Sequence, residues 1–502
     1  MHFVRLVSAT LIVAAAAQAA PNLPFDHPDW VLLLDARARG LLPDPVGGQQ
    51  ALGEDEVQRA LATLGLPADP RLLAPDEGGL WVRPVESATL RAVALYEHDR
   101  PYSLPVRPRN IAGDVGYSCA GEEGRPCGGG LGVMQELDSS AGFGTWLSAT
   151  SRLRFDFGNN RYTPAVELDR AYLKAQLGPI AFEVGRDVIA LGPSARAAIQ
   201  VSRNAAPLDQ LRGWTRPFSL PFLDPDTLRV SFFYFIARLR DPQFYEGAFV
   251  DCTRMQIDLF RRVELGGSRL LQFGGHGAPA IDLSSFVTEH FGRYYDANKA
   301  PLGDNRLAFD LAVAVPELAG GRFYTEVSFE DFRKQELNVF RYDADYLLGA
   351  EFRAVKAGPL RRILLEAVKT GRLSQEGIYW LTGWTNAGRT LGSALGPDAL
   401  SLYLRGELEL PFARVSPWVE AVRFWSDTYK DDSLGGGGVT VDKAGPAESR
   451  GRAGVDLSIP LRKALLLEAS VFVERVTGAD FVAGAGRHNA GVLATLRFLP
   501  EF

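Results

Sequence analysis

The sequence contains little cysteine, with Cys119, Cys127 and Cys252 as its three copies in 502 residues. None belongs to a Cys-x-x-Cys pair, and the six histidines do not fall at the spacing of metal ligands, which argues against a zinc site. We therefore expect no metal and no other cofactor. Cys119 and Cys127 enclose a short loop, so they form either a disulfide in an oxidising compartment or two free thiols. We expect Cys252 to be a buried or lone thiol.

Excess positive charge and long apolar runs are absent as well. The net charge is −6 at pH 7, which argues against a nucleic-acid partner, because such proteins present a basic patch. Beyond the first twenty residues, no charge-free apolar stretch reaches the roughly 20 residues that a membrane-spanning helix needs. A membrane protein without such helices has to be a closed β-barrel, because lipid offers no partner for exposed backbone groups.

Signatures of catalysis are weak. Residues 392–396 (Gly-Ser-Ala-Leu-Gly) have the wrong spacing for a Gly-x-Ser-x-Gly elbow, and no phosphate-binding loop ends in Gly-Lys-Ser/Thr. Ser268 and His276 are close in sequence, but a Ser-His pair also needs a third polar group that fixes its geometry. We therefore expect a protein that is not an enzyme, with a barrel hydrolase as the weaker alternative.

Both ends of the chain have features of an exported Gram-negative barrel. Arg5 precedes an apolar run over residues 6–17 and the small-x-small sequence Ala-Gln-Ala at 17–19, which predicts a cleaved signal peptide over residues 1–20. Back from Phe502, one face of the last strand is apolar at every second position, as in a strand between lipid and water. The terminal aromatic is similar to the signal that barrel assembly machinery reads, so we expect Phe502 to contact that machinery.

Two short helices are predicted near the N-terminus. Residues 29–39 have apolar side chains near helical spacing, and residues 53–64 begin with acids, which the helix dipole favours in a first turn. A third short helix is expected around Ala88–Tyr96. We assign residues 21–141 to a periplasmic helical and loop unit.

From about Gly142 the hydropathy pattern changes to a period of two. It is clearest at residues 152–157 (Arg-Leu-Arg-Phe-Asp-Phe), 323–329 and 404–410. At about 20 residues per strand and connection, residues 142–502 allow about 16–18 antiparallel strands. The predicted fold class is an all-β transmembrane barrel with a small N-terminal helical unit. A soluble propeller or sandwich also alternates, but no clear repeat of about 40–50 residues is present.

Three further segments combine turn formers with polar residues. Residues 185–207 hold Gly-Arg, then Leu-Gly-Pro-Ser at 191–194, then Val-Ser-Arg-Asn-Ala-Ala-Pro at 201–207. Residues 329–331 read Phe-Glu-Asp, and residues 388–398 hold Gly-Arg-Thr-Leu-Gly followed by Gly-Pro-Asp. These segments, with helices ahead of a barrel, resemble the Wzi-type outer-membrane proteins involved in capsule assembly.

The resemblance implies a monomeric, non-enzymatic barrel in outer-membrane lipid that helps to retain polysaccharide at the cell surface. Its candidate polysaccharide-binding residues are Arg186, Arg203, Asn204, Glu330, Asp331, Arg389 and Asp398. By chemistry alone, these groups either hydrogen-bond sugar hydroxyls and carboxylates or form an internal salt-bridge network. Four aromatic residues are expected in loops: Trp380, Trp384, Trp425 and Tyr429. They either stack on sugars or belong to the aromatic girdle at the membrane interface. The alternative function is a porin-like channel for small solutes.

Overall fold

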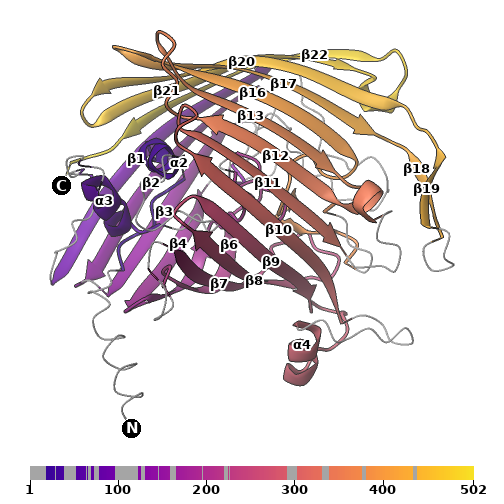
Figure 1. Cartoon of the computed structure of the whole chain (residues 1–502), viewed down its shortest axis with the longest axis horizontal. Coiled ribbons are helices and arrows are strands. Elements are labelled where there is room, and N and C mark those ends of the chain that lie inside the picture. Colours follow the sequence, from indigo (N-terminus) through magenta and orange to yellow (C-terminus); the bar gives the residue numbers. More distant parts are fainter. Residues whose placement is uncertain are drawn as a thin grey trace.

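The protein forms a closed antiparallel β-barrel of 18 strands in a computed structural model, with short helices at one mouth (Figure 1). The structure describes residues 19–25, 27–28, 30–38, 52–63, 65, 69, 71–72, 79–96, 123–125, 130–144, 146–158, 166–194, 196–219, 224, 227–290, 302–330, 339–372, 374–375, 380–432 and 438–501. No described helix is long and apolar enough to cross a bilayer.

The helices are short and the barrel strands are long. The helices are α2 (Trp30–Ala38), α3 (Glu54–Thr63), α4 (Leu283–His290), the π-helix η2 (Val339–Asp343) and the 3-10 helix η4 (Ala479–Phe481). The barrel strands are β1 (Leu80–Tyr96), β2 (Gly130–Phe143), β3 (Leu147–Gly158), β4 (Val166–Leu177), β5 (Ile180–Asp187), β6 (Leu208–Thr215), β7 (Leu228–Arg238), β8 (Phe249–Leu259), β9 (Val263–Phe273), β10 (Gly303–Val315), β11 (Gly321–Glu330), β12 (Asp345–Phe352), β13 (Leu360–Thr370), β16 (Ala399–Leu410), β17 (Ala413–Trp425), β20 (Ala447–Arg462), β21 (Leu465–Thr477) and β22 (Gly486–Phe498). Two separate hairpins pair β14 (Thr385–Asn386) with β15 (Arg389–Thr390), and β18 (Thr428–Asp432) with β19 (Gly438–Lys443).

The first and last strands close the sheet. β1 pairs with β2 and also with β22, where Ala88 lies opposite Phe498 and Leu95 opposite Gly491. Closure removes the unpaired backbone groups that a sheet edge would present. One end of the barrel has short turns, such as residues 178–179, and we call it the inner end. The other end carries long connections, such as residues 274–302, and we call it the outer end.

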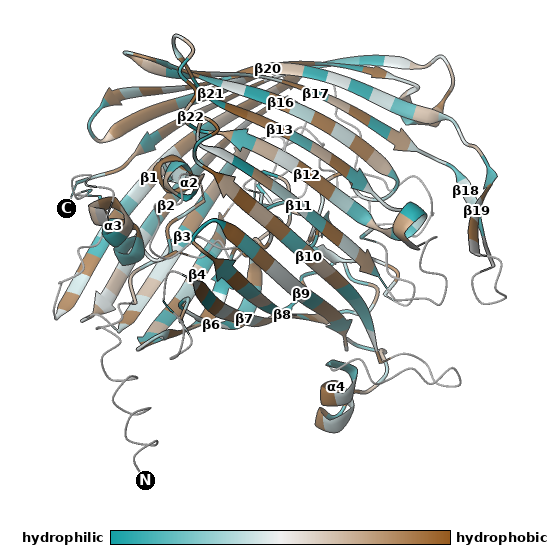
Figure 2. Ribbon diagram, viewed as in Figure 1, coloured by the Kyte–Doolittle hydropathy of each residue, from teal (hydrophilic) through white to brown (hydrophobic). Residues whose placement is uncertain are grey.

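Side chains alternate across the barrel wall. On β5, Ile180, Phe182 and Val184 are 40%, 46% and 52% exposed on the outer face, whereas Ala181 and Glu183 are buried on the inner face. Figure 2 shows the same alternation as apolar and polar bands along the strands. Apolar groups outside and polar groups inside are the reverse of a soluble protein and typical of a transmembrane barrel.

Many charged side chains are buried on the lumen side of the strands. The largest fully buried side chains include Arg152, Arg212, Arg254, Arg306 and Arg322. A buried guanidinium is stable only when carboxylates and backbone oxygens surround it. The lumen is therefore held by ion pairs as well as by apolar packing.

The barrel begins earlier than the sequence predicted. The boundary expected at Gly142 is wrong, because β1 and β2 are full members of the sheet. The third helix expected at Ala88–Tyr96 is part of strand β1. Alanine, valine and leucine occupy both faces of this stretch, which hides the period of two. Pairing with β2 and β22 overrides the helical spacing.

Other expectations are confirmed. The strand number falls within the predicted range, the first two helices form as α2 and α3, and Cys252 is a free, buried thiol. Residues 1–18 of the predicted signal peptide (residues 1–20), the pair Cys119 and Cys127, and Phe502 lie outside the described residues.

Candidate functional site

Two long connections at the outer end meet inside the barrel, and together we call them the plug: residues 188–206 and 371–398. Ser202 donates its backbone N–H to the carbonyl of Leu391 at 2.7 Å and its hydroxyl to the carbonyl of Gly392 at 2.5 Å. Ser393 donates to the carbonyl of Ile199 at 3.1 Å. The structure thus joins the first and third family-like segments, which lie about 190 positions apart in sequence.

An apolar cluster anchors the plug to the barrel wall. Trp380 and Trp384 are 1% and 0% exposed and belong to one buried cluster with the inward-facing Phe233, Phe235 and Leu270. These two tryptophans are therefore packing residues, and they are not accessible to a sugar. Burying these two side chains against the wall stabilises the docked position of the 371–398 connection.

Two of the predicted binding residues hold the plug together. The Asn204 side-chain amide donates to the carbonyl of Thr390 at 3.1 Å and to its hydroxyl at 2.9 Å. Arg389 donates to the carbonyl of Arg125 at 2.6 Å and to that of Asn204 at 3.5 Å. Both side chains are buried.

The remaining predicted residues are dispersed. Arg186 forms a bidentate pair with Asp209 at 2.6 and 2.9 Å, with both side chains partly exposed. Glu330 ends β11, where its carboxylate lies 3.9 Å from the guanidinium of Arg306. Asp331 lies outside the described residues.

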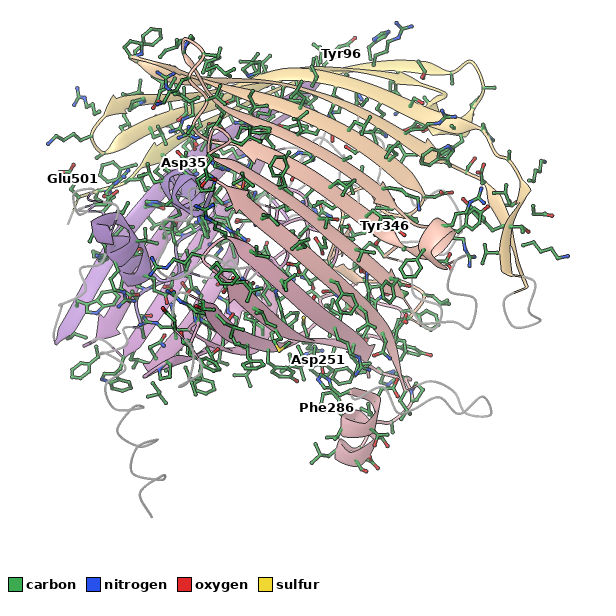
Figure 3. All side chains as sticks on the ribbon, viewed as in Figure 1. Asp35, Tyr96, Asp251, Phe286, Tyr346 and Glu501 are labelled. Atoms are coloured by element: carbon green, nitrogen blue, oxygen red, sulfur yellow. The ribbon has the colours of Figure 1, made fainter. Side chains whose placement is uncertain are left out.

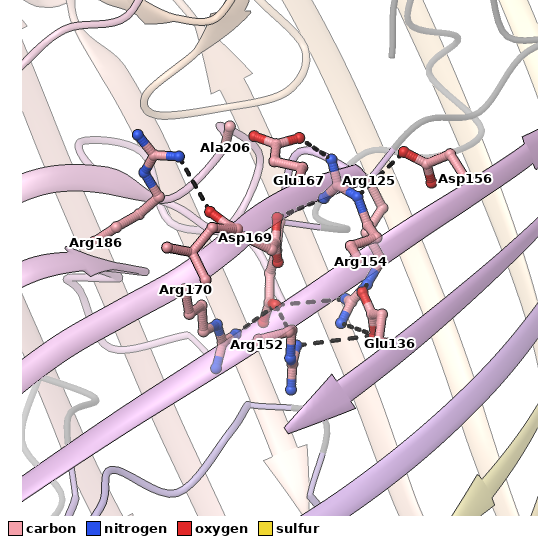
Figure 4. Close-up of polar contacts among 12 residues, drawn as sticks. Arg125, Glu136, Arg152, Arg154, Asp156, Glu167, Asp169, Arg170, Arg186 and Ala206 are labelled. Atoms are coloured by element: carbon pink, nitrogen blue, oxygen red, sulfur yellow. Dashed lines mark hydrogen bonds and ion pairs between the residues drawn. The ribbon is translucent and has the colours of Figure 1, made fainter. Parts of the chain in front are cut away.

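Beside the plug, an ion-pair network covers the lumen face of β2, β3 and β4 (Figure 4). Arg152 binds Asp138 at 2.6 Å, and Arg125 binds Glu136 at 2.7 Å. Arg170 reaches Glu123 at 2.5 Å. This network connects the barrel wall to the segment around Arg125.

The helical unit is fastened inside the inner mouth. Leu33 of α2 and Val57 of α3 belong to one buried apolar cluster. The Asp35 carboxylate lies 3.1 Å from Arg353 and 2.6 Å from Arg362, which flank the turn between β12 and β13. Figure 3 labels Asp35 at this mouth.

A chamber of about 570 Å³ remains between this helical unit, the plug and the wall of β1, β16, β17 and β20–β22. Its aromatic lining residues are Phe25, Trp30, Trp418 and Phe472, and its charged lining comprises eight arginines and four carboxylates. Arg203 is the predicted binding residue that lines it, with its guanidinium 5.4 Å from the ring centre of Phe25. Aromatic faces beside hydrogen-bonding forks suit a sugar, which presents both C–H faces and hydroxyls.

Sequence reasoning missed most of this chamber. Arg405, Arg414 and Arg452 were not singled out, although strand alternation places each on the inner face. The arginine content of a face could have been counted along β16, β17 and β20. The sequence could not predict that Phe25 lies beside these strands, because its position depends on how the N-terminal segment enters the inner mouth of the barrel.

Asp398 lies just before β16 and meets the outer hairpin. Its carboxylate accepts a hydrogen bond from the Tyr429 hydroxyl at 2.9 Å. Burial raises the pKa of Asp398 to about 6; Asp427 also raises it, whereas the contact with Tyr429 and the charges of Lys369 and Arg372 lower it.

This raised pKa predicts a local pH dependence. Since burial lifts the folded-state pKa above the ordinary 3.8, the folded region around Asp398 is most stable below about pH 4, and it loses stability as the pH rises through 6 and the buried carboxyl ionises. Asp398→Asn should remove this dependence, which amounts to about 3 kcal/mol for a shift of this size. Hydrogen exchange at Tyr429 and its neighbours from pH 4 to 7 measures it. Asp480→Asn is a matched control, because Asp480 has a similar left-handed backbone. An equal pH slope in Asp398→Asn and wild type would contradict the prediction.

Comparison with known proteins gives a family and a fold. The family model described as capsule assembly protein Wzi matches residues 111–491. The chain is similar to Escherichia coli Wzi, described as an outer membrane protein involved in group 1 capsule assembly and a carbohydrate-binding β-barrel. The two are 14% identical over 97% of this chain and 100% of that chain, with a TM-score of 0.65.

Two further solved structures are similar to a lesser degree. Pseudomonas aeruginosa OprD is 10% identical over 86% of this chain and 97% of that chain, with a TM-score of 0.46. A BenF-like porin from Pseudomonas fluorescens Pf-5 is 9% identical over 82% and 97%, with a TM-score of 0.45. No curated protein matches the sequence.

Proposed function

Because this chain belongs to the Wzi capsule assembly family, we propose that it binds or organises exported capsular or surface polysaccharide in the outer membrane, without catalysing a reaction on it. The observation that carries this proposal is a lumen occupied by a buried plug and a helical unit. A lumen filled in this way suits a binding protein better than a general pore. The E. coli relative, described as a carbohydrate-binding barrel, supports the same function.

The orientation follows from the two ends of the barrel. The inner end, with short turns, would face the periplasm, and the outer end, with long connections, would face the outside. Residues 1–20 would be removed as a signal peptide, Phe502 would be read by the barrel assembly machinery, and the barrel would act as a monomer in outer-membrane lipid.

The predicted binding residues take two roles in this proposal. Arg203 would touch the sugar, because it lines the chamber. Asn204 and Arg389 would act through the plug that they hold together. Arg186, Glu330 and Asp398 would contribute at the outer end, close to the long connections, and Asp331, which lies outside the described residues, is proposed from the sequence alone.

Hydrolysis is a weaker alternative on the described geometry. The Ser268 hydroxyl makes a hydrogen bond with the side-chain oxygen of Gln200, inside the barrel. His276 lies in the connection after β9, and its backbone N–H donates to the carbonyl of Glu246. A nucleophile requires a base within hydrogen-bond reach, and Ser268 is engaged elsewhere.

Deletion of the gene from an encapsulated strain should test the proposal. We expect the deleted strain to shed surface polysaccharide into the medium while total synthesis stays constant. Complementation with the wild-type gene should restore retention, whereas a gene lacking residues 188–206 and 371–398 should restore less. Unchanged retention in the deleted strain, together with no binding of the purified polysaccharide to the folded barrel, would contradict the function.

A further inference from the structure

The chamber at the inner end carries more guanidinium groups than carboxylates. Among its lining residues, eight arginines face four acidic side chains. Five of those arginines are ion-paired with described carboxylates: Arg37 with Glu264, Arg125 with Glu136, Arg405 with Asp456, Arg452 with Glu420, and Arg497 with Glu468. Two of the five partners, Glu264 and Glu420, do not line the chamber. The chamber lining therefore carries more positive than negative side chains.

Arg414 is the lining arginine with the least compensation. It lies near the start of β17 and faces the chamber. Its Nε is buried and has no hydrogen-bond partner among the described residues. Glu409, its cross-strand neighbour on β16, lies 3.8 Å from Arg361. Its neighbour on β20 is the neutral Ser458.

An arginine with a buried donor that lacks an acceptor favours an anionic ligand. A buried donor without an acceptor costs free energy, and a carboxylate can accept two parallel hydrogen bonds from one guanidinium. Trp418 and Phe472 lie on the same chamber wall, and the guanidinium of Arg452 is 5.5 and 5.1 Å from their ring centres. Aromatic faces next to cations suit a sugar ring that bears a carboxylate.

The size of the chamber is compatible with a short oligosaccharide. Its volume of about 570 Å³ lies within the range of roughly 300–1,000 Å³ that is usual for pockets of small ligands. The lining includes Leu466 and Arg497, near the start of β21 and the end of β22. The chamber therefore extends from the short turns of the inner end to Arg203 of the plug.

We propose that this inner-end chamber binds acidic sugar units through their carboxylates, with Arg414 as the primary contact. The inference rests on the proposed polysaccharide function and specifies its ligand class and its place in the barrel. A polysaccharide with uronic acid units would then be held inside the wall, at the end that faces the periplasm.

Calorimetric titration of the full folded barrel in detergent tests this site with defined probes. Tetragalacturonate should bind saturably, and cellotetraose, a neutral tetramer, should not. Raising the salt concentration should weaken the binding, because it screens charge pairs. Inorganic phosphate serves as a third probe, and binding as tight as that of tetragalacturonate would identify a general anion site and overturn the sugar assignment.

Arg414→Gln should weaken tetragalacturonate binding about tenfold or more, since a hydrogen bond to a charged group contributes roughly 1.5–3 kcal/mol. Arg414→Lys, which keeps the charge but loses the fork, should give an intermediate value. Arg475→Gln is the matched control, because Arg475 is exposed on the outer face of β21. Equal binding by wild type and both Arg414 variants, or equal binding of the neutral tetramer, would overturn the proposal. Capsule retention in the deletion strain is measured separately, so failure here leaves that result standing.

Discussion

Gly392→Val should undock the plug while leaving the barrel folded. A Cβ at Gly392 would lie 1.9 Å from the carbonyl oxygen of Ile199 and 2.4 Å from Nε2 of Gln375. That carbonyl oxygen accepts hydrogen bonds from Ser393 and from Gln375, so moving it breaks the contact between the two halves of the plug. Overpacking of this kind costs about 1–3 kcal/mol or more.

Trypsin cleavage after Arg389 measures the undocking, because Arg389 is buried in the docked plug. We expect cleavage in Gly392→Val to be about 10- to 100-fold faster, since proteolysis follows the population of the open form. Planar-bilayer recordings should show more frequent channel events than wild type. Gly451→Val is the control, because a Cβ at Gly451 meets no atom within 4 Å. Identical cleavage in both variants and wild type would show that the contact does not hold the plug.

Arg212→Met should strongly destabilise the whole barrel. The guanidinium of Arg212 is 1% exposed and lies 2.7 Å from Glu183 and 2.6 Å from Asp187. Removing it leaves two buried carboxylates with weaker compensation: the side-chain amide of Asn22 donates to both, and Arg170 lies 3.7 Å from Asp187. Breaking a buried ion pair in this way costs about 3–5 kcal/mol.

The shift from folded to unfolded gel mobility on heating or in urea measures this loss. Arg262→Met is a matched control, because Arg262 and Glu317 form an exposed ion pair at 2.8 Å, which contributes about 0–1 kcal/mol. The double variant Arg212→Met with Glu183→Gln should recover part of the stability, because it removes one uncompensated charge. A single variant as stable as the control would show that water or rearrangement compensates the carboxylates.

Alternation of apolar and polar residues predicted the barrel strands well where one face of the strand is apolar and the other is charged. The apolar and charged residues of 152–157 appear as the two faces of β3. The prediction failed over the second half of β1, because alanine, valine and leucine occupy both faces there. Only pairing with β2 and with the last strand decides that this segment belongs to the sheet.

The candidate site was predictable in part. The sequence indicated Asn204 and Arg389 as functional candidates. It did not indicate whether they bind a ligand or hold the plug together, because both roles use the same hydrogen-bond donors. It did not indicate Arg414, since one arginine in an alternating strand resembles any other. Its importance arises from the cross-strand neighbours that the fold places beside it.

The sequence by itself determined that the chain is a barrel, because a period of two leaves one apolar and one polar face on nearly every strand. The tertiary structure alone decided what occupies the lumen, where loops about 190 positions apart close into a plug. The physical reason is that the period of a strand is local, whereas the pairing of buried polar groups depends on partners that folding brings from distant parts of the chain.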